Sequence, residues 1–321
     1  MVQLIFFLSK LAFIQMPSIR GRIVISALVG VATGAFCLFL VRTLHQGAGD
    51  FSWAIHLAQR FLARQNPYDT PAEQYPFTAA LFALPFVRFS PETAAAIFYG
   101  FSSALLAFGL TRTGYHRLLV FLAYPYWIGL LTVQWSTVIT ASAFFPLLIP
   151  VAMAKPQVGL PVFLTHFNRR SFWACVAVGL LSLILMPRWP HLWVGQMGYY
   201  QHFFAIAVLP GPLVLLALLR YRDRDAWLLL FTSLMPQRWF FDAFVLWLIP
   251  KSRRELLVTV VFSWCSGIWR WYHQPTDFVQ VGRWIVLSIY LPMLVIVLMR
   301  RTAQDGDVGS GEVSDMELNR L

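Results

Sequence analysis

The stretch "RIVISALVGVATGAFCLFLV", residues 22–41, carries one arginine at its start and no other charge. Twenty mostly apolar residues in a helix are enough to cross about 30 Å of hydrocarbon. The stretch that follows, "GAGDFSWAIHLAQRFLARQNPYD" at 47–69, is of opposite character, with two aspartates, a histidine and two arginines. A spanning helix is therefore followed at once by a charged segment beside the membrane.

The composition extends the membrane interpretation to the whole chain. Of 321 residues, 58% are hydrophobic and only 12% are charged, whereas a soluble domain has about 25% charged residues. A soluble fold of this length could not bury so much apolar surface, but lipid would solvate it. We therefore expect an all-α polytopic membrane protein.

The apolar runs predict about 8–11 membrane segments. Two of them, 77–89 and 157–166, are too short for a straight span, and "MPQRWFFD" interrupts another at 226–249. Non-helical backbone at membrane depth is tolerated where protein or a water-filled cavity surrounds it, so the broken segments indicate a cavity. The expected segments are 22–41, 77–89, 92–111, 117–133, 136–153, 157–166, 172–187, 203–219, 226–249, 255–272 and 282–300.

The net charge of +11 reports topology rather than nucleic-acid binding. Most basic residues cluster at the ends of apolar segments, as the positive-inside rule predicts for cytoplasmic loops. We expect a multi-pass protein of the cytoplasmic membrane, with both termini cytoplasmic, contacting membrane lipids and no nucleic acid. The expected divisions are an interfacial helix at 1–21, a transmembrane domain at 22–301 with an outer loop at 42–76, and a disordered acidic tail at 302–321.

Asp50 begins the charged segment and has two interpretations. Residues 50–64 fit an amphipathic helix lying in the outer interface, with His56, Arg60 and Arg64 at positions i, i+4 and i+8. Directly before such a helix, a carboxylate commonly caps the free backbone N–H groups. Alternatively, Asp50 is a catalytic base at the membrane face.

Five further polar positions lie in or beside apolar runs. Lys155 costs about 3 kcal/mol at membrane depth, so it either faces a cavity or snorkels to an interface. Arg238 and Asp242 are spaced i, i+4, which favours an ion pair, with a phosphate or sugar contact as the alternative. Gln134 fits a solvated helix end, and Tyr75 fits an aromatic belt.

The sequence lacks several catalytic motifs. The histidines have no metal-ligand spacing, and neither a Gly-rich phosphate loop nor G-x-S-x-G occurs. A nucleotide-driven pump is therefore not expected. No cofactor is predicted, although the sequence does not exclude a role for a divalent metal ion.

An ordered set of short motifs resembles glycosyltransferase family 87. These motifs are the Asp-led segment, "NPYD", "YPFTAALFALPF", "VQWSTVIT" and "KPQ". The likeness covers roughly residues 22–165, together with "MPQRWFFDAF" and its continuation to about 250. "YPF" stands where the family has "YPP", "VQW" stands where it has "GQ" followed by Asn, and the chain is compact for the family.

The resemblance implies a GT-C fold and a reaction. The family transfers sugars, mannose among them, from polyprenyl-phosphate donors at the outer face. Asp50 matches the aspartate that acts as general base in an inverting transfer, and cationic side chains would stabilise the departing phosphate. The expected substrate-binding residues are His56, Arg60, Arg64, Asn66, Tyr68, Tyr75, Gln134, Lys155, Gln157, Arg238 and Asp242.

Two other functions fit the same sequence. Ionisable residues within spans often line a transport path, which would suit a transporter of lipid-linked glycans, although no internal repeat supports one. The shortened chain also suits a non-catalytic homologue that serves as a structural subunit beside an unidentified membrane-protein partner.

Overall fold

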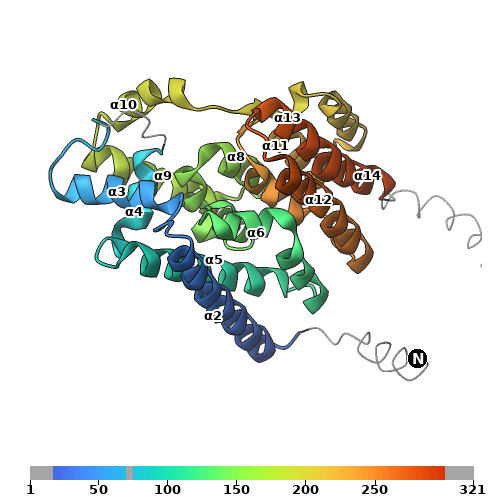
Figure 1. Cartoon of the computed structure of the whole chain (residues 1–321), viewed down its shortest axis with the longest axis horizontal. Coiled ribbons are helices and arrows are strands. Elements are labelled where there is room, and N and C mark those ends of the chain that lie inside the picture. Colours follow the sequence, from blue (N-terminus) through green and yellow to red (C-terminus); the bar gives the residue numbers. More distant parts are fainter. Residues whose placement is uncertain (1–16, 70–74, 301–321) are drawn as a thin grey trace, which may run out of the picture.

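The computed structural model describes residues 17–69 and 75–300, and within them the chain is predominantly helical, with two very short strands (Figure 1). The expected acidic tail at 302–321 and most of the expected interfacial helix at 1–21 lie outside the described residues. The elements are α2 (Ile19–Thr43), α3 (Phe51–Leu62), α4 (Phe77–Ala83), η1 (Leu84–Phe86), α5 (Pro91–Leu110), η2 (Tyr115–Leu122), α6 (Tyr124–Leu131), α7 (Ser136–Ser142), η3 (Pro146–Ala154), α8 (Pro156–Thr165), α9 (Arg169–Leu185), α10 (Trp189–Gln196), η4 (Met197–Tyr199), β1 (Phe203–Phe204), η5 (Ala205–Ala207), η6 (Gly211–Arg220), α11 (Arg224–Leu234), β2 (Pro236–Gln237), η7 (Phe240–Leu248), α12 (Arg253–His273), α13 (Phe278–Ile285), η8 (Val286–Tyr290) and α14 (Leu291–Met299).

Three helices in the described part of the chain are long and apolar enough to cross a membrane. They are α2, α5 and the continuous run from α13 to α14, and the pair α9 and α10, bent by 94°, would make a fourth span. The chain is therefore an α-helical membrane protein, as the composition predicted. The expectation of 8–11 segments exceeds this number, because most of the other apolar runs are divided into shorter helices.

Prolines mark several of these short helices. Pro146 begins η3 and Pro156 begins α8, while Pro150 lies inside η3 and Pro161 inside α8, where a proline removes one backbone donor and bends the helix. The run at 226–249 is interrupted as predicted, since α11 ends at Leu234 and η7 begins at Phe240. Between them, β2 pairs antiparallel with β1 in a two-residue ladder.

Small residues let α2 and α5 pack with their backbones in close contact (Figure 1). A Cβ added at Gly100 of α5 would lie 2.7 Å from the carbonyl oxygen of Gly30 and 3.1 Å from the Cα of Gly34, both in α2. Membrane helices associate through such small-residue surfaces, because lipid provides no hydrophobic drive between helices. This pairing anchors the first span beneath the loop that contains Asp50.

An ion cluster around the buried carboxylate of Asp225 joins the C-terminal helices. The carboxylate of Asp225 in α11 lies 2.5 Å from the ammonium of Lys251 and 2.5 Å from the guanidinium of Arg300. Glu255 in the first turn of α12 lies 3.3 Å from Arg300 and also closes a capping box with Ser252. The basic residues after α14 and before α12 therefore share two carboxylates.

We expect Gly100→Ala to destabilise the protein by about 1–3 kcal/mol, because the added methyl group overlaps the α2 backbone. The measurement is thermal unfolding of the purified protein in one detergent. Gly195→Ala in α10 is the matched control, since a Cβ there meets nothing within 4 Å. Equal melting temperatures for the two variants would contradict the close packing of α2 on α5.

Candidate functional site

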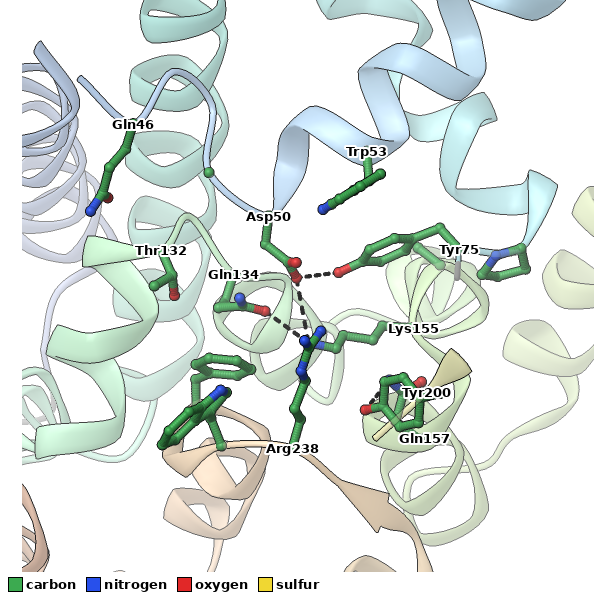
Figure 2. Close-up of a pocket in the computed structure, with 15 residues that line it drawn as sticks. Gln46, Asp50, Trp53, Tyr75, Thr132, Gln134, Lys155, Gln157, Tyr200 and Arg238 are labelled. Carbon is green, nitrogen blue, oxygen red and sulfur yellow. Dashed lines mark hydrogen bonds and ion pairs between the residues drawn. The ribbon is translucent and has the colours of Figure 1, made fainter. Parts of the chain in front are cut away.

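Five segments far apart in the sequence enclose a cavity of about 370 Å³ (Figure 2). They are the start of α3, the loop before α4, the α6–α7 turn, the junction of η3 and α8, and the segment from β2 to η7. Tyr200 closes a further side. The lining residues are Gln46, Gly49, Asp50, Trp53, Tyr75, Pro76, Thr132, Gln134, Ala154, Lys155, Gln157, Tyr200, Arg238, Trp239 and Phe241.

A glycine-dependent loop holds Asp50 against the α6–α7 turn. Gly47 and Gly49 have φ values of +58° and +53°, which glycine adopts without steric cost. A Cβ at Gly49 would lie 2.6 Å from the carbonyl oxygen of Thr132. This close approach lets the backbone N–H of Asp50 donate to that same oxygen at 2.8 Å.

The carboxylate of Asp50 turns away from its own helix. Asp50 stands at the N-cap position of α3, yet its side chain accepts no capping hydrogen bond. Of the two interpretations of Asp50, the helix cap is therefore wrong. Instead, the carboxylate faces the cavity, where it accepts a hydrogen bond from the hydroxyl of Tyr75 and remains 22% exposed (Figure 2).

Tyr75 is a buried hydrogen-bond donor rather than a belt residue. Burial raises the pKa of its hydroxyl well above 10, and the neighbouring Asp50 raises it further. The phenol therefore stays protonated at neutral pH and donates to Asp50. The buried Tyr68 hydroxyl donates to the backbone oxygen of Tyr75 at 3.1 Å and so helps to hold Tyr75 in place.

Lys155 is the buried cation of the cavity. Pro156 disfavours helical geometry in the preceding residue, and Lys155 has φ −140° and ψ 78° between η3 and α8. Its ammonium donates to the amide oxygen of Gln134 at 2.7 Å and lies 3.0 Å from Asp242 and 3.6 Å from Asp50. The sequence alternative in which Lys155 faces a cavity is therefore confirmed.

Asp242 and Arg238 do not form the expected side-chain ion pair. Asp242, whose side chain is fully buried, accepts the backbone N–H of Arg238 at 2.9 Å and pairs with Lys155. This leaves the guanidinium of Arg238 facing the cavity, and its buried Nε has no hydrogen-bond partner among the described residues.

The α6–α7 turn presents Gln134 to Lys155. Val133, directly before it, has a φ of +51°, which is sterically unfavourable for a β-branched residue. The backbone N–H of Gln134 bonds to the oxygen of Gly129 at 2.8 Å. Gln134 is therefore a buried acceptor, and the alternative of a solvated helix end is wrong.

Several expected substrate-binding residues lie elsewhere. The helix α3 forms as predicted, but it buries the face that carries Phe51, Ala54, Ile55, Leu57 and Ala58. His56 is exposed, Arg60 is half-buried, and Arg64 follows the end of the helix. None of the three lines the Asp50 cavity; Arg64 and Asn66 line a separate one together with Arg188. We therefore leave these residues out of the site. Tyr68 does not line the cavity either and touches the site through the backbone of Tyr75.

Other lining residues were not expected from the sequence. Trp239 and Phe241 are neighbours of Arg238, and their position beside a predicted site residue was a signal that could have found them. The ring of Phe241 lies 4.7 Å from the ammonium of Lys155. Tyr200 gave no signal, because its contact, a hydrogen bond of 3.1 Å from Gln157, joins distant segments. Gln46, Gly49, Trp53, Pro76, Thr132 and Ala154 are the other lining residues that were not expected.

A second cavity of about 330 Å³ adjoins the first and has a different character. Pro76 lines both. Nearly all the other lining side chains are apolar, and they come from α4, η3, α8, α9 and α10: Thr78, Ala152, Met153, Pro156, Gly159, Leu160, Phe163, Cys175, Trp189 and Trp193. A polar, charged chamber thus lies beside an apolar one.

The site carries two carboxylates, one ammonium and one guanidinium. Among the described residues, no three His, Cys, Asp or Glu side chains are grouped to hold a metal ion. Comparison with protein-family models, curated proteins and solved structures found no match for this chain. The chemistry of the site is therefore argued from its own residues.

We expect Lys155→Met to destabilise the protein by about 3–5 kcal/mol, because it leaves Asp50 and Asp242 without their cation. Lys251→Met is the matched control. The side chain of Lys251 is 56% exposed, and Arg300 remains beside its partner Asp225, so its loss should cost about 1 kcal/mol or less. Unfolding in detergent would measure both, and equal losses would contradict a central role for Lys155.

Proposed function

We propose that this chain is a membrane glycosyltransferase of the GT-C type, which transfers a sugar such as mannose from a polyprenyl-phosphate donor to a lipid or glycan acceptor at the outer face of the cytoplasmic membrane. The observation that carries the proposal is the orientation of Asp50. A carboxylate at a helix start normally caps that helix, whereas Asp50 faces a charged cavity instead. The resemblance of the ordered motifs to family 87 supports the same function.

The reaction needs one base and one stabilised leaving group. The acceptor hydroxyl attacks the anomeric carbon of the donor, and the bond from that carbon to the phosphate oxygen breaks. The configuration at the anomeric carbon is inverted. Asp50 takes the hydroxyl proton, and polyprenyl phosphate leaves with the bonding electron pair. Asp50 suits this role because its carboxylate is the accessible one of the pair, while Asp242 is fully buried.

Arg238 is the best candidate to hold the donor phosphate. The ammonium of Lys155 is already shared among Gln134, Asp242 and Asp50. The guanidinium of Arg238 lines the cavity with an unpartnered Nε, and guanidinium groups bind phosphate through paired hydrogen bonds. Lys155 then holds the two carboxylates in position, and Arg238 stabilises the charge that develops on the leaving phosphate.

The adjoining apolar cavity suits the lipid part of the donor. A polyprenyl phosphate joins a charged group directly to a long hydrocarbon chain. The two cavities match this arrangement, since a charged cavity and an apolar one meet at Pro76. The first isoprene units would lie against side chains such as Leu160, Phe163 and Trp193, which gain from burial without needing hydrogen bonds.

We expect Asp50→Asn to lower transfer roughly 100- to 10,000-fold, because the amide cannot accept the hydroxyl proton. The assay is sugar transfer from a radiolabelled polyprenyl-phosphate mannose by the protein in liposomes. Asp69→Asn, at an exposed carboxylate in the same loop, is the control and should transfer at the wild-type rate. Full activity of Asp50→Asn would refute the role of base, and lipid translocation without a new glycosidic bond would favour the transporter.

We expect Arg238→Gln to lower the transfer rate about 100-fold, because one cationic donor to the developing phosphate charge is lost. Arg188→Gln is the matched control, since Arg188 is an exposed arginine in the separate cavity beside Arg64. Equal activity of the two variants would place the phosphate away from Arg238.

A further inference from the structure

A third cavity, of about 430 Å³, lies on another side of Trp239 at the C-terminal end of α12. Its lining residues are Trp239, Arg270, Trp271, Gln274 and Pro275. Trp239 also lines the Asp50 cavity, so one indole forms a wall of both. The proposed transfer uses none of the other four residues.

The end of α12 keeps this cavity open. The helix finishes at His273, and Gln274 takes a left-handed conformation with φ +41°, its N–H bonding to the oxygen of Arg270 at 2.9 Å. Pro275 then prevents the helix from continuing. As a result, the last helical turn presents Arg270 and Trp271 beside Trp239 instead of burying them under another turn.

The lining combines flat aromatic faces with strong hydrogen-bond donors. The guanidinium carbon of Arg270 lies 5.1 Å from the ring centroid of Trp239, and Trp271 is 80% exposed. A pyranose ring has an apolar C–H face that packs on an indole, and hydroxyls that accept from a guanidinium and pair with a carboxamide. A hydrocarbon chain would leave the polar groups of Arg270 and Gln274 unused.

The Asp50 cavity thus has neighbours of opposite chemistry. The one across Pro76 is apolar, and the one across Trp239 is aromatic and polar. A lipid-linked donor would occupy the apolar side. We propose that the cavity formed by Trp239, Arg270, Trp271, Gln274 and Pro275 binds a sugar of the acceptor, so that the acceptor is a glycan or glycosylated headgroup. This assignment rests on the proposed function.

A neighbouring residue supplies the matched control. Tyr272 is 79% exposed and follows Trp271 on the same helix, but it does not line the cavity. If the two aromatic residues only anchor α12 in the membrane interface, truncating either would have the same effect. If the cavity binds a sugar, truncating Trp271 weakens the binding and truncating Tyr272 does not.

The test measures the binding of soluble disaccharides to the full chain in nanodiscs. Saturation-transfer NMR detects the binding, and no sugar donor is present. The probes are mannobiose, maltose and cellobiose. We expect at least one to bind, and Trp271→Ala to weaken its binding about fivefold through the lost ring contact. Tyr272→Ala should bind it as wild type does.

The outcomes separate this inference from the proposed function. No binding of any probe, or equal weakening by Trp271→Ala and Tyr272→Ala, would overturn the sugar site. Asp50-dependent transfer in liposomes together with that result would leave the glycosyltransferase standing. Trp271-dependent disaccharide binding without any transfer would instead refute the enzyme and retain the sugar site.

Discussion

The arrangement of the site depends on the buried ammonium of Lys155. An isolated charge in a low-dielectric interior is very costly, and the cost is offset when the charge is paired and hydrogen-bonded. The ammonium nitrogen of Lys155 lies near three side-chain oxygens, 2.7 Å from Gln134, 3.0 Å from Asp242 and 3.6 Å from Asp50. Because they come from three separate segments, one ammonium fixes the relative positions of α3, the α6–α7 turn and η7.

The two carboxylates around Lys155 are not equivalent. Asp242 is nearer, fully buried and also held by the backbone N–H of Arg238. Asp50 is farther away, partly exposed and bonded to the Tyr75 hydroxyl. The first therefore balances the ammonium, and the second is left accessible to a ligand. With the guanidinium of Arg238, the formal charges of these four side chains sum to zero.

The sequence predicted the individual polar positions better than their arrangement. The cost of a lysine among apolar residues indicated a cavity at Lys155, and the proline-interrupted run indicated Arg238. Helical periodicity placed His56, Arg60 and Arg64 on the polar side of the predicted helix, opposite its apolar stripe. The apolar face is the one packed inside, and none of the three cations lines the Asp50 cavity. Tyr200 could not be predicted, since only the folded chain brings it to Gln157, and proline positions alone do not decide whether a run spans or breaks.

Breaks in the backbone are what allow so many polar groups to converge. A continuous helix directs its side chains outward at fixed angles, so it offers a shared space only one or two of them. Here Asp50 follows a left-handed glycine, Gln134 follows a strained Val133, and Lys155 precedes a proline. Arg238 lies between β2 and η7. Each departure from helical geometry costs free energy and would expose backbone groups to lipid. The short helices and the cavity therefore depend on each other. The breaks between the helices bring the polar side chains together, and the polar cavity shields the exposed backbone groups at those breaks from lipid.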